Sequence, residues 1–174
     1  GMVVGRLLRD RGSRPRVLLF AEPQGLKGDA RANWERLAVS GPPEVVLDSS
    51  AWKRTLPEIQ SATLLVDALF GTGLAKPLEG FFVEVVRDIN GAFPQARVVA
   101  VDLPSGISAD TAELIGECVR AHASVTFTAP KTAHVFPPAC EYVGDWVLKP
   151  IGTPEEALTS DQELNLNLTT ARDL

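Results

Sequence analysis

The sequence predicts an α/β fold in which helices cover both faces of a mostly parallel sheet. Short apolar runs of strand length alternate with segments whose apolar residues recur at helical intervals. The apolar runs are almost uninterrupted, as expected of strands that are buried on both faces. An aspartate interrupts one of these runs and another aspartate ends a second run, and a glycine-containing turn follows in both cases. Ligands bind beyond such strand ends in open α/β sheets, so the same pattern indicates where a site would lie.

The first elements alternate between helix and strand. Residues 2–8 predict an amphipathic helix, because their valines and leucines fall on one face, and Gly12 ends it. Residues 16–20 form a short apolar run of strand type, and residues 29–38 have helical spacing of apolar positions. We expect the next strand at residues 44–47.

The middle of the chain repeats this unit. After a stretch that is broken by Pro57, residues 63–70 form the most apolar run and predict the strongest buried strand. A glycine-rich turn follows, and residues 80–89 then predict a helix from the spacing of their apolar side chains. Residues 97–101 predict another buried strand.

The last strands are expected at residues 123–127 and 144–148. No convincing helix separates them, so they are expected to close one edge of the sheet, with an antiparallel orientation left open. Together the elements predict a Rossmann-like, three-layer α/β/α sandwich. We assign residues 1–154 to this domain and the polar residues 155–174 to a linker or C-terminal tail.

The composition restricts the class of protein. The 174 residues suit a single domain with one sizeable core, and 45% hydrophobic with 22% charged residues is ordinary for a globular chain. The net charge of −5 argues against a nucleic-acid partner. No apolar run approaches the roughly 20 residues of a membrane span, so no membrane partner is expected. Cys118 and Cys140 lack metal-ligand spacing and predict two buried thiols in a cytoplasmic protein.

The first candidate site follows the most apolar strand. Asp67 interrupts the apolar run and the turn Gly71-Thr72-Gly73 comes four residues later. Glycines let the backbone approach a ligand closely and leave N–H groups free for an anion such as a phosphate, while Thr72 adds a hydroxyl donor. The alternative is an ordinary tight turn with a capping aspartate, because short glycine patterns recur by chance.

The second candidate site follows the strand at residues 97–101. Asp102 ends this strand and is followed by Pro104-Ser105-Gly106. We expect Asp67 and Asp102 to form a pair at the carboxyl edge of adjacent strands, where a buried carboxylate must be hydrogen-bonded, paired or bound to a cation. The two acids and the Ser105 hydroxyl are candidate ligands of a hard cation, or one acid is a general acid/base. The alternative is that both acids cap the helices that follow.

Four segments in this order resemble the signature of the YjeF N-terminal family, the NAD(P)HX epimerases. They are residues 66–74, residues 101–106, residues 126–131, and residues 144–147 with 151–152. The resemblance covers residues 1–154. It implies a cytoplasmic isomerase that repairs nicotinamide nucleotides by interconverting the R and S forms of hydrated NADH and NADPH. It also implies a homodimer, and in bacteria the domain is often fused to an ADP-dependent dehydratase domain.

Carried over residue by residue, the resemblance implies a potassium ion bound by Asp67 and Ser105. It implies that Asp102 contacts the substrate, and Asp102 is then also the best candidate for the catalytic acid/base. Lys131 matches a lysine of the family's Pro-Lys turn, where it would place a positive charge near an anionic ligand or lie on the surface as a solvated lysine. The implied substrate-binding loop consists of Gly71, Thr72, Gly73, Leu74, Ala75, Lys76 and Pro77.

The resemblance is incomplete at the first residues. Family members open with a strand that leads into an Asn-Asn-Gly-Gly-Asp-Gly phosphate loop, and Gly1 matches the last glycine of that loop. The asparagine that would bind the cation and the backbone donors for a pyrophosphate are then absent from residues 1–174, which leaves either an impaired epimerase or a fragment that lacks its first strand. We therefore expect these residues to keep the fold but to bind NAD(P)H analogues weakly, and we expect the upstream segment to restore binding.

Two other functions are weighed against the epimerase. Relatives of this fold also serve as non-catalytic binding or dimerisation modules, but a scaffold has less reason to keep both Asp67 and the turn at residues 104–106. A Rossmann dehydrogenase is ranked last, because no Gly-x-Gly-x-x-Gly follows a first strand.

Overall fold

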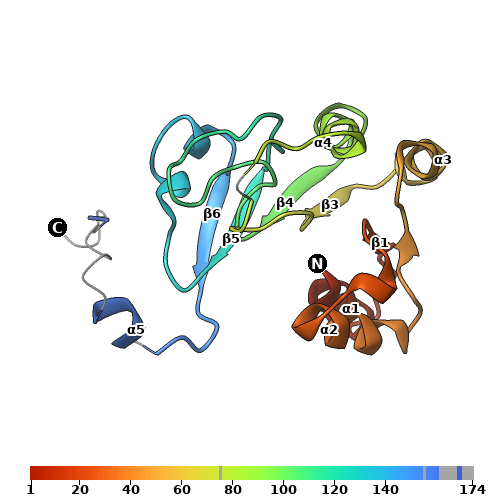
Figure 1. Cartoon of the computed structure of the whole chain (residues 1–174), viewed down its shortest axis with the longest axis horizontal. Helices are drawn as coiled ribbons and strands as arrows, with labels where there is room; N and C mark the ends of the chain where they lie inside the picture. Colours follow the sequence, from red (N-terminus) through yellow and green to blue (C-terminus); the bar gives the residue numbers. More distant parts are fainter. Residues whose placement is uncertain (75, 155, 161–167, 170–174) are drawn as a thin grey trace.

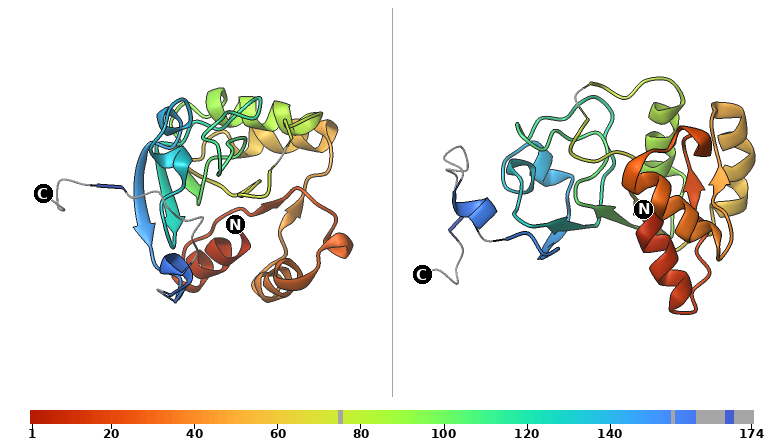
Figure 2. Two further views of the ribbon diagram at one scale, coloured as in Figure 1. Left: turned by 60° about the vertical axis from the view of Figure 1, so that its left-hand side comes forward. Right: turned by 60° about the horizontal axis from the view of Figure 1, so that its bottom comes forward.

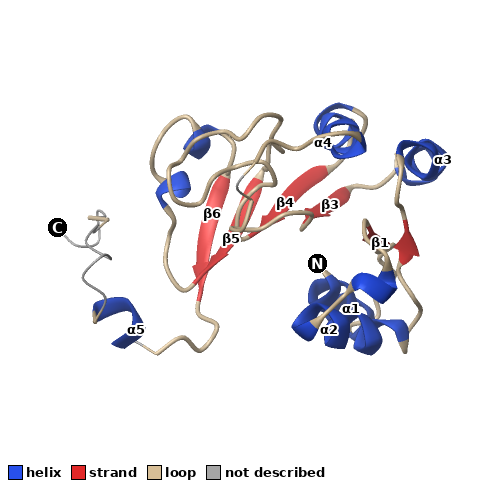
Figure 3. Ribbon diagram, in the orientation of Figure 1, coloured by secondary structure: helices blue, strands red, loops and turns tan. Residues whose placement is uncertain are grey.

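The structure is a computed structural model that describes residues 1–174 except 75, 155, 161–167 and 170–174. Helices and strands alternate along most of the chain (Figure 1, Figure 3). The helices are α1 (Met2–Asp10), α2 (Gly28–Ala38), α3 (Ser49–Ile59), α4 (Phe81–Gly91) and α5 (Glu156–Thr159). The strands are β1 (Leu18–Leu19), β2 (Glu44–Val45), β3 (Leu64–Asp67), β4 (Arg97–Val101), β5 (Ala123–Phe127) and β6 (Asp145–Lys149).

The larger sheet has the order β3-β4-β5-β6 and all its strands are parallel. The orientation of β6, which the sequence left open, is parallel to β5, with Ala123 opposite Asp145. The connection between them makes 3-10 turns at Thr132–His134 and Ala139–Glu141. As predicted, β6 closes one edge of this sheet.

The smaller sheet consists of β1 and β2, which are also parallel. Among the described residues, β1 and β3 do not pair with each other, so the expected single sheet is divided in two. A cavity of about 970 Å³ lies between the two sheets and is lined by residues of α1, β1, β3 and α4. Leu64 of β3 is 53% exposed, so the expectation that this strand is the best buried is wrong. The reason is that β3 borders the cavity and pairs only with β4 among the described strands.

Helices α1 to α4 lie in two layers. Figure 1 shows α3 and α4 along one side of the strands and α1 with α2 on the other, and the left view of Figure 2 keeps this separation. The fold is therefore α/β with parallel sheets, as predicted. None of the helices in the described ranges is both long and apolar enough to cross a membrane.

Helix α3 was not predicted, because Pro57 within it reads as a break. The Asp48 carboxylate starts the helix by accepting a hydrogen bond from the Ala51 N–H at 2.7 Å. Trp52 then buries its ring in the core beside Val85 of α4. Pro57 removes the backbone hydrogen bond to the Lys53 carbonyl, and the helix ends two residues later at Ile59.

Candidate active site

The carboxyl ends of β3, β4 and β5 lie side by side, because the three strands are parallel and in neighbouring register. Asp67 is the last residue of β3 and Asp102 is the first residue after β4. The segment that follows β5 brings Lys131 to the same edge. The structure thus places the predicted acids on adjacent strands.

Asp67 forms a buried pair with Ser105. The Ser105 N–H and hydroxyl donate to the two carboxylate oxygens of Asp67, both at 2.7 Å, and the Leu69 N–H adds a longer bond of 3.3 Å. Asp67 is only 3% exposed. Burial raises the pKa of the Asp67 carboxyl, and the hydrogen bonds from Ser105 oppose that rise.

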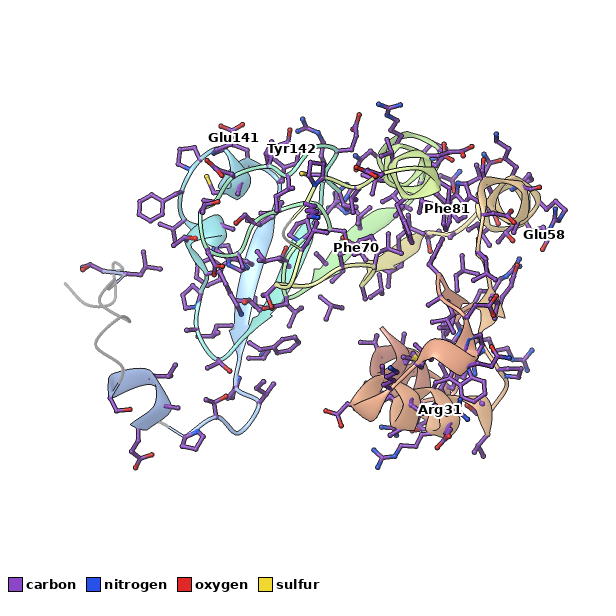
Figure 4. The ribbon with its side chains drawn as sticks, in the orientation of Figure 1. Arg31, Glu58, Phe70, Phe81, Glu141 and Tyr142 are labelled. Carbon is purple, nitrogen blue, oxygen red and sulfur yellow. The ribbon has the colours of Figure 1, made fainter. Side chains whose placement is uncertain are left out.

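The groups around this pair include three oxygen donors of the kind that hard cations prefer. The Ser105 oxygen also accepts from the Phe70 N–H at 3.0 Å and lies 3.4 Å from the Phe70 carbonyl oxygen. Figure 4 labels Phe70 on the segment that leaves β3. A carboxylate, a hydroxyl and a carbonyl are oxygen donors, and a cation beside a desolvated carboxylate would offset its burial. No cluster of three or more His, Cys, Asp or Glu side chains occurs in the described part of the chain, so a transition-metal site is not indicated there.

Gly106 allows the turn that carries Ser105. Its φ of 103° lies in the region that favours glycine, and a Cβ at this position would stand 2.4 Å from the Glu117 carbonyl oxygen. The Cys118 thiol donates to the Gly106 carbonyl at 2.8 Å. The predicted Pro-Ser-Gly turn therefore needs its glycine for both conformation and space.

Asp102 has different partners from Asp67. Its Oδ1 accepts hydrogen bonds from the Lys131 ammonium at 2.5 Å and from the Thr126 hydroxyl at 2.9 Å. The expected pairing of the two acids is replaced by two separate pairs, Asp67 with Ser105 and Asp102 with Lys131. Neither acid caps a helix, since α4 begins after Gly80 and the described segment after Asp102 makes turns rather than an α-helix.

Lys131 is neither a free ligand-binding cation nor a solvated lysine. Its side chain is 22% exposed and its ammonium group donates to Asp102, Thr126 and the Phe127 carbonyl. The sequence offered no signal for this pairing, because Asp102 and Lys131 are joined only through the neighbouring ends of β4 and β5. His134, which contacts the Asp102 carbonyl, was also missed.

The predicted substrate loop lies at the surface beside a second pocket. Four of its residues, Thr72, Gly73, Leu74 and Pro77, line a pocket of about 590 Å³. Gly71 and Lys76 are exposed and do not line it, and Ala75 lies outside the described residues. The opposite wall consists of Ser108, Asp110, Thr111, Glu113, Leu114, Ile115 and Gly116. This wall was not predicted, because it has neither a strand-length apolar run nor helical spacing.

Comparisons with known proteins show the family of this chain. Residues 1–133 match the family described as YjeF-related protein N-terminus. The chain is 37% identical over 166 residues to the bifunctional NAD(P)H-hydrate repair enzyme Nnr of Thermofilum pendens, a match that covers 95% of this chain and 31% of that protein. It is 39% identical over 157 residues to the NAD(P)H-hydrate epimerase of Rhodobacter capsulatus, covering 87% of this chain and 67% of that protein.

A solved structure has the same fold. The crystal structure of yeast YNL200c superposes with a TM-score of 0.70 at 19% identity, covering 98% of this chain and 68% of the yeast chain. At that identity the likeness shows the fold alone. The chain spans about a third of the length of the bifunctional relatives, 31% for the Thermofilum protein and 32% for that of Moorella thermoacetica.

Proposed function

Since this chain belongs to the family of YjeF-related N-terminal domains, we propose that it is an isomerase that interconverts the R and S forms of hydrated NADH and NADPH. The names of its relatives, NAD(P)H-hydrate epimerase and bifunctional repair enzyme, support this activity. The observation that carries the proposal is Asp102, a partly exposed carboxylate at the carboxyl edge of the sheet whose Oδ1 is tethered by Lys131. Active sites of parallel α/β sheets lie at this edge.

In this proposal Asp102 is the acid/base residue. Its Oδ1 is occupied by Lys131 and Thr126, whereas Oδ2 makes no hydrogen bond within the described ranges. Oδ2 is therefore the oxygen that exchanges a proton with the hydrated dihydronicotinamide ring. A positioned carboxylate of this kind contributes roughly a hundredfold or more to a proton-transfer step. No net redox change is needed, because only the configuration at the hydrated carbon changes.

We further propose that the loop at residues 71–77 binds the substrate. Its backbone N–H groups and the Thr72 hydroxyl are donors for a phosphate of the nucleotide. The pocket that this loop shares with residues 108–116 has room for part of the substrate. The opposite wall carries two acids, Asp110 and Glu113, and no lysine or arginine is among the described lining residues. The loop backbone must therefore supply the groups that bind an anion.

Potassium is the proposed cofactor, with Asp67 and Ser105 as two of its ligands. The bound ion would supply positive charge that organises the substrate's phosphate beside an acidic strand end. The carboxylate, hydroxyl and carbonyl oxygens of Asp67, Ser105 and Phe70 support a hard cation. Ser105 also links the ion site to the loop, because its hydroxyl oxygen accepts from the Phe70 N–H directly before Gly71.

A strand from a part of the full-length protein outside residues 1–174 is proposed to occupy the cavity between β1 and β3. Both strands are parallel to their partners and leave the edge toward this cavity unpaired among the described strands. Gly1 lies at the same place, since a Cβ on it would stand 3.2 Å from the Ala68 Cβ. A strand in this cavity would therefore lie beside the Asp67 site, where the family's phosphate loop is expected.

Location and assembly complete the proposal. We propose a cytoplasmic homodimer, with a dehydratase domain elsewhere in the same protein, as the bifunctional relatives suggest. The two cysteines are free, which suits a reducing compartment. Light scattering of the full-length protein over a range of concentrations tests the dimer, and a constant monomer mass would contradict it.

The function is tested by following R to S equilibration of NADHX with residues 1–174 and with the full-length protein. The full-length protein is expected to equilibrate the two forms much faster than buffer, and residues 1–174 more slowly than the full-length protein. A folded full-length protein that binds NAD(P)H analogues without accelerating equilibration would instead support the non-catalytic binding module. Equal calorimetric affinities of residues 1–174 and of the full-length protein for an NADPH analogue would contradict the proposed role of the additional strand.

A further inference from the structure

Asp102 stands in a backbone conformation that an aspartate rarely adopts. Its φ of 72° is left-handed, and a residue with a Cβ is held there only when its surroundings enforce it. The surroundings are two hydrogen bonds: the Asp102 N–H donates to the Val125 carbonyl at 2.8 Å, and the Asp102 carbonyl accepts from His134 Nε2 at 3.1 Å. The peptide groups on both sides of the Asp102 Cα are therefore fixed.

The hydrogen bonds of His134 define its tautomer. The Lys131 N–H donates to His134 Nδ1 at 3.1 Å, so Nδ1 is an acceptor and the ring proton lies on Nε2, where it points to the Asp102 carbonyl. The ring is buried beside Trp146, with 5.5 Å between ring centroids. Burial lowers the pKa of His134 and the positive charge of Lys131 acts in the same direction, while the hydrogen bond to the Asp102 carbonyl opposes the shift.

Lys131 fixes the carboxylate in the same way that His134 fixes the backbone. An ammonium group has three protons, and those of Lys131 go to Asp102 Oδ1, the Thr126 hydroxyl and the Phe127 carbonyl. The Thr126 hydroxyl in turn donates to the same Oδ1 at 2.9 Å. With Oδ1 held by two donors, the carboxylate plane has one orientation and Oδ2 is the oxygen left for another partner.

We propose that the turn from Lys131 to His134 is the positioning element of Asp102, in which Lys131 orients the carboxylate and His134 holds the left-handed backbone. Both residues act through Asp102 rather than by touching the substrate. The inference rests on the proposed function for its kinetic consequence, whereas the physical coupling of the three residues is independent of any substrate. It explains why Lys131 and His134, in the segment after β5, both contact Asp102, the first residue after β4.

Kinetics of Lys131→Met in the full-length protein test the role of the lysine. Methionine keeps the length of the side chain and removes its charge and donors. We expect kcat for R to S equilibration to fall roughly ten- to hundredfold with KM changed less than about threefold, because orientation affects the chemical step more than binding. Lys131→Arg, which keeps the charge and donors, should retain more of kcat than Lys131→Met. Lys53→Met is the matched control, since Lys53 forms an exposed ion pair with Glu84 on α3 and α4.

A double substitution separates positioning from a merely structural role. In an Asp102→Asn background, Lys131→Met should lower kcat by less than about threefold, because the group that it orients is already lost. Additive losses in kcat, or a Lys131→Met protein whose melting temperature falls while its kcat stays unchanged, would overturn the proposal. His134→Ala should likewise lower kcat in the wild-type background and add little in the Asp102→Asn background.

Unfolding measurements decide the inference if the wild-type protein shows no equilibration at all. That result refutes the proposed function and leaves the positioning element to be judged by a denaturant-unfolding cycle of the same Lys131 and Asp102 variants. A coupling of roughly fivefold in the unfolding equilibrium constant supports the positioning element. Additivity within about twofold shows that the two residues do not act as a unit and overturns it.

Discussion

Replacing Gly106 by alanine is expected to disrupt the Asp67–Ser105 pair through the backbone. Gly106 has φ 103°, and an added Cβ would meet the Glu117 carbonyl oxygen at 2.4 Å and Cys118 Cα at 2.8 Å. Both contacts are with backbone atoms, so no flexible side chain can move aside. The segment at residues 117–118 must shift instead, which strains the hydrogen bond from Val119 N–H to the Ser105 carbonyl.

The magnitude follows from two contributions. A left-handed conformation costs a non-glycine residue about 1–2 kcal/mol, and forcing an extra carbon into a packed interior costs about 1–3 kcal/mol. Gly106→Ala should therefore lower the free energy of unfolding by about 2–5 kcal/mol. For a domain of this size the melting temperature should fall by roughly 5–15 °C.

Gly12→Ala is the matched control for this change. Gly12 also has a positive φ, 83°, but a Cβ there meets nothing within 4 Å, so only the conformational cost of about 1–2 kcal/mol applies. Thermal melts of wild type and both variants give the comparison. If Gly106→Ala melts within about 2 °C of Gly12→Ala, the close approach to residues 117–118 does not contribute to the loss of stability, which contradicts the expected effect of Gly106→Ala.

Three further outcomes are expected from other parts of the site. Potassium chloride should raise the melting temperature of the wild type more than an equal concentration of N-methylglucamine chloride does, and Ser105→Ala should lose most of that difference; an unchanged difference would remove Ser105 from the ion site. The pKa of His134 lies below its usual 6.5 because the ring is buried, so the unfolded chain takes up this proton first as the pH falls. His134→Gln should therefore lose less stability than wild type as the pH falls below about 6.5, and parallel curves from urea titrations would contradict this. A thiol reagent at pH 8 should modify Cys140 before Cys118, because Cys118 is buried and its pKa is raised to about 11; equal rates in the folded protein would show that Cys118 is accessible.

The strand ends of the candidate site could be predicted from the sequence. Parallel strands place their carboxyl ends at one edge, so Asp67, Asp102 and Ser105 could be assigned to a common region from the apolar runs and the turns alone. The structure confirms their neighbourhood, while their roles as cation ligands and as acid/base stay predictions.

The partners of Asp102 could not be predicted in the same way. Lys131 lies in a connection without regular periodicity, and its contact with Asp102 depends on the register of β4 against β5. His134 carries no local signal for its bond to the Asp102 carbonyl. Contacts of this kind are set by tertiary packing, which the spacing of apolar residues does not encode.

Two differences in the fold have local causes. Helix α3 escaped prediction because Pro57 resembles a break, although the helix continues through it and ends two residues later at Ile59. Apolar runs predict where strands lie but not which strands pair. The division of the sheet between β1 and β3 could therefore not be predicted from the sequence. Of the two cysteines, Cys118 is buried as expected, whereas Cys140 is only partly buried and the expectation for it is wrong.

The most direct test of the acid/base role of Asp102 is the rate of R to S equilibration of NADHX by the full-length protein with Asp102→Asn. Asparagine tolerates the left-handed φ of 72° and keeps an oxygen for Lys131, so the protein should remain folded and lose about 1–2 kcal/mol of stability. Equilibration should slow by roughly a hundredfold or more, since the proton carrier is gone. Normal equilibration by a variant with an unshifted circular dichroism spectrum would contradict the central role of Asp102.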